Sequence, residues 1–200
     1  QRRFADAETA LQEAIRLNPK HPDSHAALAS VHLAAQRWGD ARKCYEAALE
    51  LEPTRFEAWV NLGTALNSLG DVQRAAAAFR EAIRLNEDLA EAHENLASVL
   101  ELEGRIDEGL THYRRAYRLK GGEEIRIREA LALPPVYKSL DDLNAHWARM
   151  IGSVDRLVEE GVCVDPASTS VSPPFFLAYQ GFNDRPLLEQ IARLFQHDTT

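Results

Sequence analysis

Two asparagines, Asn61 and Asn95, occupy matching places in two similar stretches that are otherwise rich in apolar residues. A primary amide offers one acceptor and two donors, so it can hydrogen-bond the backbone of an extended polypeptide whatever side chains that polypeptide carries. Small polar and acidic residues recur with the same spacing on the same predicted helix faces. The candidate peptide-binding residues are Asn61, Asn95, Thr64, Ser98, Glu57 and Glu91.

A purely structural interpretation of these residues is also open. An asparagine at this position can serve local hydrogen bonding or solubility, and Ala27 takes the corresponding position in the stretch that precedes Asn61. Glu57 and Glu91 fall at predicted helix starts, where a negative charge interacts favourably with the helix dipole by about 0.3–1 kcal/mol. The pattern alone does not decide between the two interpretations.

Other candidate chemistry is weak. His21 and His25 are four residues apart, but Pro22 lies between them at a predicted helix start, and no second pair of ligands has a spacing typical of zinc. Gly121 and Gly122 follow a predicted helix rather than a strand, so they do not indicate a phosphate-binding loop. The serines of residues 165–170 have no general base at a defined spacing. We expect no catalytic residue, metal or cofactor in this segment.

Composition narrows the class of protein further. The 200 residues are 45% hydrophobic and 8% aromatic, with a formal net charge of −8 and no basic stripe that would bind nucleic acid. No apolar run reaches the roughly 18–20 residues needed to span a bilayer, and we find no signal peptide. Cys44 and Cys163 lie far apart, which favours free thiols in a reducing compartment. We therefore expect a cytoplasmic protein that binds neither nucleic acid nor membranes.

A constant period organises the first part of the chain. Alanines recur at equal intervals, at positions 14, 48, 82 and 116. Residues that match a known helix–turn–helix repeat of this length are Pro53, Trp59, Leu62, Gly63, Leu66, Gly70, Ala75, Phe79 and Ala82. They resemble the tetratricopeptide repeat (TPR). The resemblance implies an all-α fold: a right-handed superhelix (α-α solenoid) with a concave groove and a C-terminal helical connector.

Within residues 1–120 we expect a partial repeat (1–21) followed by whole repeats at 22–55, 56–89 and 90–123. On the first helix of the second whole repeat, Trp59, Leu62 and Leu66 form one apolar stripe. Asn61 lies roughly 200° around the helix from Trp59, because successive residues are about 100° apart. We therefore expect Asn61 to face away from the core, on the helix that lines the groove.

The repeat pattern fades after Lys120. We expect an altered helix pair to cap the repeats over residues 121–161, with a short first helix that ends before Pro134 and Pro135 and a long second helix capped by Ser139. The apolar stripe predicted for the long helix is Leu140, Leu143, Trp147, Met150, Ile151, Val154, Leu157 and Val158. We expect residues 162–200 to form a connector that leads into a catalytic domain outside this segment, with an aromatic cluster around Phe175 and Phe176 and a last helix near Pro186.

A narrower resemblance covers residues 122–196. The two prolines at 134–135 and the segment Phe176–Leu177–Ala178–Tyr179, with Gly181, are similar to the bacterial relatives of protein O-GlcNAc transferase. That resemblance implies a glycosyltransferase domain beyond Thr200, which uses a UDP-sugar donor and receives a polypeptide acceptor from the TPR groove. The alternative is a stand-alone TPR adaptor without enzymatic activity.

Overall fold

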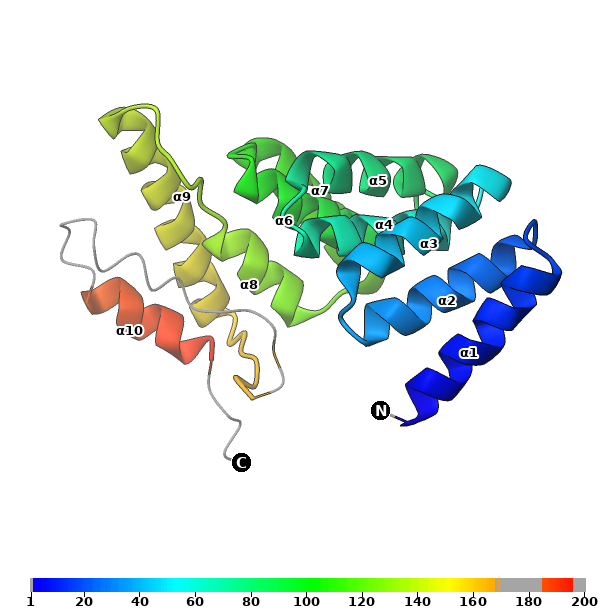
Figure 1. The fold of residues 1–200 in the computed structure, drawn as a ribbon. Helices are drawn as coiled ribbons and strands as arrows, with labels where there is room; N and C mark the ends of the chain where they lie inside the picture. Colours follow the sequence, from blue (N-terminus) through cyan, green and yellow to red (C-terminus); the bar gives the residue numbers. More distant parts are fainter. Residues whose placement is uncertain (1, 168, 170–184, 196–200) are drawn as a thin grey trace. The chain divides into compact units, whose positions relative to one another are not determined.

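The computed structural model describes residues 2–167, 169 and 185–195. These residues form ten α-helices and no strand, so the described part of the chain is an all-α, α-α solenoid (Figure 1). The helices are α1 (Arg2–Leu17), α2 (Pro22–Ala34), α3 (Trp38–Leu51), α4 (Phe56–Ser68), α5 (Val72–Leu85), α6 (Ala90–Leu102), α7 (Ile106–Lys120), α8 (Glu123–Leu131), α9 (Leu140–Glu159) and α10 (Arg185–Arg193). The predicted aromatic cluster at residues 175–182 lies outside the described residues.

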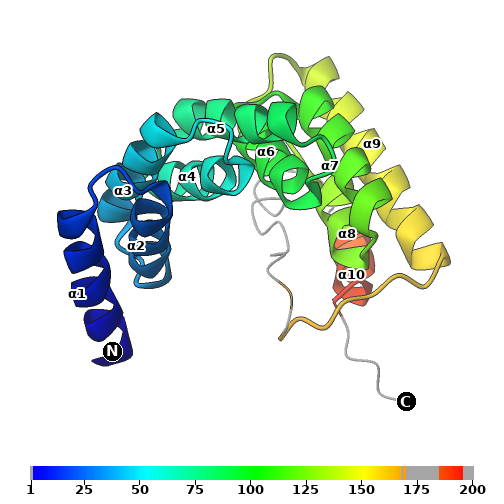
Figure 2. The same cartoon turned by 90° about the vertical axis from the view of Figure 1, so that its right-hand side faces the viewer.

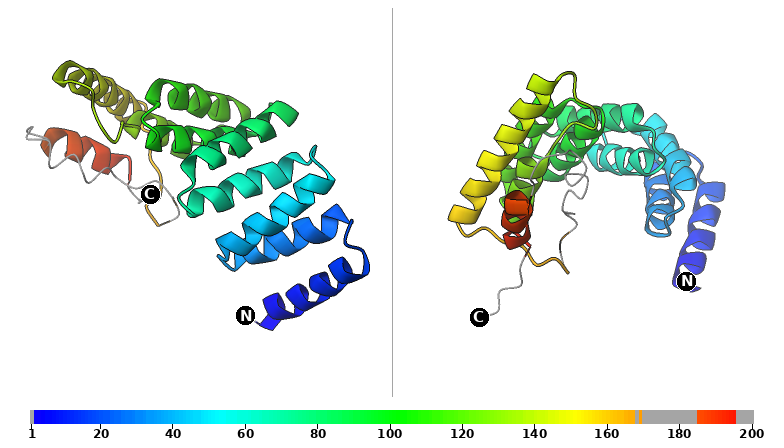
Figure 3. Two further views of the ribbon diagram at one scale, coloured as in Figure 1. Left: turned by 45° about the horizontal axis from the view of Figure 1, so that its top comes forward. Right: turned by 90° about the vertical axis from the view of Figure 1, so that its left-hand side faces the viewer.

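The chain divides into two compact units, Gln1–Val99 and Leu100–Thr200. In the first unit, α1 packs against α2, α2 against α3, α3 against α4, and α4 against α5. The left panel of Figure 3 shows these helices side by side in chain order. In addition, α2 contacts α4, so the first helices of two successive repeats are neighbours. Side chains of α2 and α4 can therefore line the same face of the first unit.

Small residues let the helices of the first unit approach closely. Ala41 and Ala75 are fully buried and occupy the same position on the second helices of successive repeats. Gly63 on α4 lies directly against the ring of Phe79 on α5, because a Cβ at Gly63 would be 2.6 Å from Phe79 Cε1. Tyr45 occupies the position of Phe79 one repeat earlier, and both rings are buried. The small and large residues that recur in each repeat therefore lie at the positions where neighbouring helices pack closely.

The turns between paired helices need a left-handed backbone. Gly70 has φ 79° and Gly104 has φ 74°, a region that glycine adopts without a steric penalty because it has no Cβ. Gln36 takes the same position in the first whole repeat and has φ 57°. A side chain in this region costs about 1–2 kcal/mol, so the first repeat carries backbone strain that its neighbours avoid.

One aromatic side chain per repeat fixes the loop that precedes the first helix. Trp59 Nε1 donates a hydrogen bond to the carbonyl of Pro53 at 2.8 Å. His25 and His93 take the same position and bond the carbonyls of Pro19 and Glu87 through Nε2, at 2.8 and 3.1 Å. Because a carbonyl only accepts, both histidines donate from Nε2. These histidines therefore serve packing and loop attachment, in agreement with the absence of zinc-like spacing.

In the second unit, α7 packs against α8, α8 against α9, and α9 against α10 (Figure 2). Buried side chains of the last three helices form one core, which includes Ile127, Trp147, Met150 and Ile191. Ser139 caps α9 by accepting a hydrogen bond from the Asp142 backbone N–H at 3.1 Å, as predicted.

The stripe predicted for α9 is partly wrong. Leu140 is 68% exposed and Ile151 is 38% exposed. Leu140 is the first residue of the helix, and Ile151 is turned about 100° from the buried Met150. The buried stripe therefore begins later and is narrower than the sequence indicated.

Two half-buried charged side chains contact the segment before Pro134. Glu101 accepts hydrogen bonds from the Leu133 backbone N–H at 3.3 Å and from the Tyr113 hydroxyl at 3.4 Å. The Arg149 guanidinium donates to the carbonyls of Glu129, at 3.2 Å, and Ala132, at the end of α8. Burial raises the pKa of Glu101 and lowers the pKa of Arg149. The chain reversal between α8 and α9 thus depends on polar contacts as well as on the two prolines.

Candidate functional site: a polar hollow between α2 and α4

The neighbouring faces of α2 and α4, together with the end of α3 and the loop after it, enclose a hollow of about 640 Å³ in the first unit. We call this feature the α2–α4 hollow. Its lining combines small, amide, hydroxyl and charged side chains with one large apolar side chain, Phe56. The lining residues are Asp23, Ala26, Ala27, Ser30, Tyr45, Glu52, Thr54, Arg55, Phe56, Glu57, Ala58 and Asn61.

Three polar side chains from three helices meet in the hollow. The Tyr45 hydroxyl on α3 is 2.9 Å from Ser30 Oγ on α2, and the Asn61 side chain on α4 lies close enough to it to influence its pKa. Burial raises the pKa of Tyr45, and the neighbouring Ser30 and Asn61 side chains oppose this effect in part. Tyr45 is 1% exposed, so its hydroxyl is a fixed anchor for the two more exposed groups. The Asn61 amide keeps hydrogen-bonding capacity beyond this one contact.

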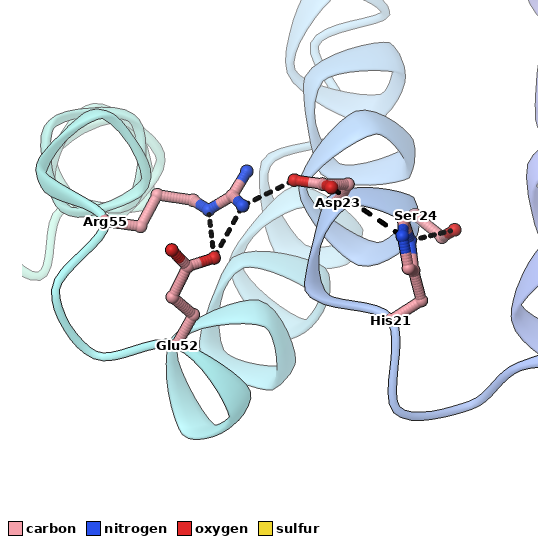
Figure 4. Close-up of polar contacts among 5 residues, drawn as sticks. All are labelled: His21, Asp23, Ser24, Glu52 and Arg55. Carbon is pink, nitrogen blue, oxygen red and sulfur yellow. Dashed lines mark hydrogen bonds and ion pairs between the residues drawn. The ribbon is translucent and has the colours of Figure 1, made fainter.

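An ion-pair network joins charged residues that line the hollow (Figure 4). Arg55, just before α4, donates to Glu52 Oε2 at 2.5 Å through Nη2 and also to the Asp23 carboxylate on α2. Figure 4 shows the Asp23 carboxylate between Arg55 and His21, whose Nε2 is 3.7 Å from Asp23 Oδ2. The hydrogen bond to Glu52 raises the pKa of Arg55 most, and the hydrogen bond to Asp23 raises it further. The network therefore connects the end of α3 and the starts of α2 and α4.

Of the six predicted peptide-binding residues, the hollow brings two together. Asn61 and Glu57 both line it, with Asn61 half-buried and Glu57 exposed. The other four, Thr64, Glu91, Asn95 and Ser98, are not among its lining residues. Thr64 donates its hydroxyl to the Val60 carbonyl of its own helix at 3.1 Å. The peptide-binding role of all six remains a prediction.

Asn61 and Asn95 differ in one contact that the sequence explains. Asn61 reaches a tyrosine hydroxyl on the preceding α3. The residue that corresponds to Tyr45 one repeat later is Phe79, which has no hydroxyl. Asn95 therefore lacks the equivalent anchor, although it is half-buried at the same position of its repeat.

Sequence reasoning did not assign Tyr45, Arg55 or Glu52 to the site. A signal for Tyr45 was present, because Ser30 shares the repeat position of Thr64 and Ser98, and a hydroxyl on the facing helix completes the group. Arg55 gave no periodic signal, since the equivalent residues are His21 and Leu89. A contact that occurs in only one repeat leaves no periodic pattern in the sequence.

Other kinds of site find no support in the described part of the chain. No group of three or more His, Cys, Asp and Glu side chains there is arranged to hold a metal ion. None of the described helices has the length and apolar character needed to cross a membrane. Cys44 and Cys163 are both free thiols.

The chain belongs to the tetratricopeptide repeat family. The family model matches residues 1–42, 26–89 and 68–124, which together cover more than half of the 200 residues. Proteins of this kind bind peptides or partner proteins. Comparison with curated protein sequences finds no match.

Solved structures of TPR proteins have the same fold. The crystal structure of MamA superposes with a TM-score of 0.63 at 21% identity and covers 78% of this chain and 91% of MamA. The crystal structure of YrrB, described as a TPR protein with an unusual peptide-binding site, gives a TM-score of 0.67 at 18% identity and covers 79% of this chain and 78% of YrrB. At these identities the similarity concerns the fold alone.

Proposed function

We propose that this TPR segment binds an extended stretch of a partner protein in the α2–α4 hollow. The observation that carries the proposal is the Asn61 amide, which lines the hollow next to the buried Tyr45 hydroxyl. Asn61 is half-buried, and a side chain with restricted freedom loses less conformational entropy when a ligand binds. An amide pairs equally well with the N–H and C=O groups of any backbone, so the hollow is suited to recognise polypeptide chain.

Several features of the lining agree with this function. The short side chains of Ala26, Ala27 and Ala58 let a main chain approach the polar groups of the hollow closely. The lining is too polar for a purely hydrophobic ligand, because it contains three carboxylates, a guanidinium and an amide. The description of YrrB as a peptide-binding TPR protein shows that a related fold supports such a function.

The proposal can be tested with peptides selected for binding. A library of random dodecapeptides displayed on phage is panned against the protein, and the affinity of the recovered peptides is measured by fluorescence anisotropy. Asn61→Ala is expected to weaken binding about two- to tenfold, because one or two hydrogen bonds to the peptide backbone are lost.

The control for this experiment is Asn67→Ala. Asn67 is a half-buried asparagine on the same helix that does not line the hollow, so its removal is expected to leave affinity unchanged. Equal affinities of wild type and Asn61→Ala, with both proteins folded, would contradict the proposed site.

We further propose that the bound polypeptide is the acceptor for a glycosyltransferase domain attached to this segment, which uses a UDP-sugar donor. Support for this narrower function is the resemblance of residues 122–196 to the bacterial relatives of protein O-GlcNAc transferase. The comparisons with known proteins match TPR proteins and give no link to that enzyme family.

The narrower proposal has its own test, which uses the protein as its gene encodes it. The full-length protein is incubated with a radiolabelled UDP-sugar and a peptide selected by the hollow. Transfer of label to the peptide supports the glycosyltransferase. A full-length protein that binds the peptide but neither binds nor consumes a UDP-sugar is instead a stand-alone adaptor.

A further inference from the structure

From the charges around the α2–α4 hollow, we infer that its preferred occupant is an extended segment carrying a lysine or arginine whose side chain pairs with Glu57. This inference rests on the proposed peptide-binding function and adds the chemistry of the ligand. The lining contains the carboxylates of Asp23, Glu52 and Glu57 but only one cationic side chain, Arg55. The hollow itself is therefore negatively charged.

The charge is not shared equally among the three carboxylates. Arg55 bonds both Asp23 and Glu52, and His21 approaches Asp23 from the other side. Glu57 makes no ion pair with any described residue, and its side chain is exposed on the first turn of α4. Glu57 is thus the carboxylate whose charge remains available to a ligand.

The repeat pattern explains why Glu57 differs from Asp23. The two residues occupy the same position in successive repeats, so the spacing that pairs Asp23 with the residue just before α4 pairs Glu57 with the residue just before α6. For Asp23 that residue is Arg55, which completes the ion pair. For Glu57 it is Leu89, which has no charge. The second repeat therefore presents a carboxylate where the first presents a neutralised pair.

Helix geometry favours this arrangement without cancelling the charge. Glu57 lies in the first turn of α4, where the helix dipole stabilises an anion by about 0.3–1 kcal/mol. Asn61 is one turn further along the same helix, so Glu57 and Asn61 share a face of α4. A backbone held by Asn61 can direct a long basic side chain toward Glu57, and the methylene stem of that side chain can lie over Ala58 and Phe56 at the edge of the hollow.

The inference is tested by the charge of the selected peptides. Random dodecapeptides displayed on phage are panned against wild type, Glu57→Gln, Asn61→Ala and the control Glu50→Gln. Glu50 is an exposed carboxylate of the same unit that does not line the hollow, so the control makes the same change in net charge elsewhere. Peptides recovered with wild type and Glu50→Gln are expected to be enriched in lysine and arginine, and this enrichment is expected to disappear with Glu57→Gln.

For a single lysine-containing peptide from the wild-type pool, Glu57→Gln is expected to lower affinity roughly two- to fivefold, as for an exposed ion pair. The difference from wild type is expected to shrink at high salt, because the charges are screened. Recovery of peptides that depend on Asn61 but show no basic preference would overturn this inference and leave the proposed function intact. Failure to recover any peptide that depends on Asn61 or Glu57 would overturn both.

Discussion

The hydroxyl of Tyr45, buried on α3, lies beside the side chain of Asn61 on α4, which is the next helix of the solenoid; burial raises the pKa of this hydroxyl, and Asn61 lowers it in part. The same hydroxyl is 2.9 Å from Ser30 Oγ on α2. One buried hydroxyl thus lies next to two polar side chains that line the same hollow. This contact connects the packing of the repeats with the proposed recognition of a partner.

Tyr45→Phe tests that connection. The ring is expected to pack as before, because Phe79 fills the same position one repeat later. Loss of the hydroxyl is expected to lower the free energy of unfolding by about 1 kcal/mol, because the hydrogen bond with Ser30 is lost, and to weaken peptide binding, because Asn61 loses a polar neighbour. Chemical denaturation and fluorescence anisotropy measure the two effects. Tyr117→Phe, which changes an exposed tyrosine of the other unit, should alter neither quantity.

Gln36→Gly is expected to stabilise the protein. Gln36 has φ 57° at the position that Gly70 and Gly104 occupy in the following repeats, and its side chain is exposed. Glycine removes the strain of a left-handed residue, for an expected gain of about 0.5–1 kcal/mol after its larger entropy in the unfolded chain is deducted. Gln36→Ala keeps the strain and serves as the control. A thermal midpoint that is no higher for the glycine variant than for the alanine variant would contradict this account.

Gly63→Ala is expected to destabilise the first unit although alanine is the better helix former. A Cβ at this position would lie 2.6 Å from Phe79 Cε1, and the ring is fully buried. Overpacking of this kind costs about 1–3 kcal/mol and exceeds the gain in helix propensity of about 1 kcal/mol. Gly39→Ala, where the added Cβ meets nothing within 4 Å, isolates the propensity effect and should be neutral or stabilising.

The sequence predicts the fold well because the fold repeats. Gly63, Gly70 and Phe79 match the repeat pattern, and the structure places them where two helices touch or where paired helices turn. Each such position recurs several times at one spacing, so the predicted fold does not depend on a chance match at any single position. Ser139 indicated a helix start by local hydrogen bonding alone, which requires no knowledge of tertiary structure.

The candidate site was predicted less completely because its contacts do not recur. The period located Asn61 and Glu57 on the right helix face, but it also proposed Asn95 as an equivalent of Asn61. Phe79, which corresponds to Tyr45 one repeat later, has no hydroxyl, so the two asparagines are not equivalent. The Arg55–Asp23 pair depends on a single arginine, and the burial of Glu101 depends on how residues 131–135 fold over it. Contacts of this kind follow from three-dimensional packing and not from spacing.

The half-buried carboxyl of Glu101 makes stability depend on pH. Burial raises its pKa in the folded protein, so its contribution to stability is fully present below the ordinary carboxyl pKa of 4.5 and is lost as the pH rises through the higher folded-state value. Glu101→Gln keeps an acceptor for the Leu133 N–H and the Tyr113 hydroxyl but does not ionise. Over this rise in pH, wild type is expected to lose stability relative to the glutamine variant.

Glu101→Ala separates the charge of Glu101 from its hydrogen bonds. This variant leaves the Leu133 N–H without its acceptor, so it is expected to lower the free energy of unfolding by about 1–3 kcal/mol. Urea titrations at several pH values above 4 measure all three proteins. Parallel pH profiles for wild type and Glu101→Gln would show that burial of this carboxyl does not contribute to the pH dependence.

The most direct measurement is the affinity of a selected peptide for Ala27→Asn. Ala27 is exposed, lines the α2–α4 hollow and occupies the repeat position of Asn61, so this variant adds a second amide to the same surface. If amides in the hollow bind the partner's backbone, Ala27→Asn should bind the peptide more tightly than wild type, while Asn61→Ala binds it less tightly. An Ala27→Asn protein that is folded but binds no better than wild type, together with an unchanged affinity of Asn61→Ala, would contradict the account.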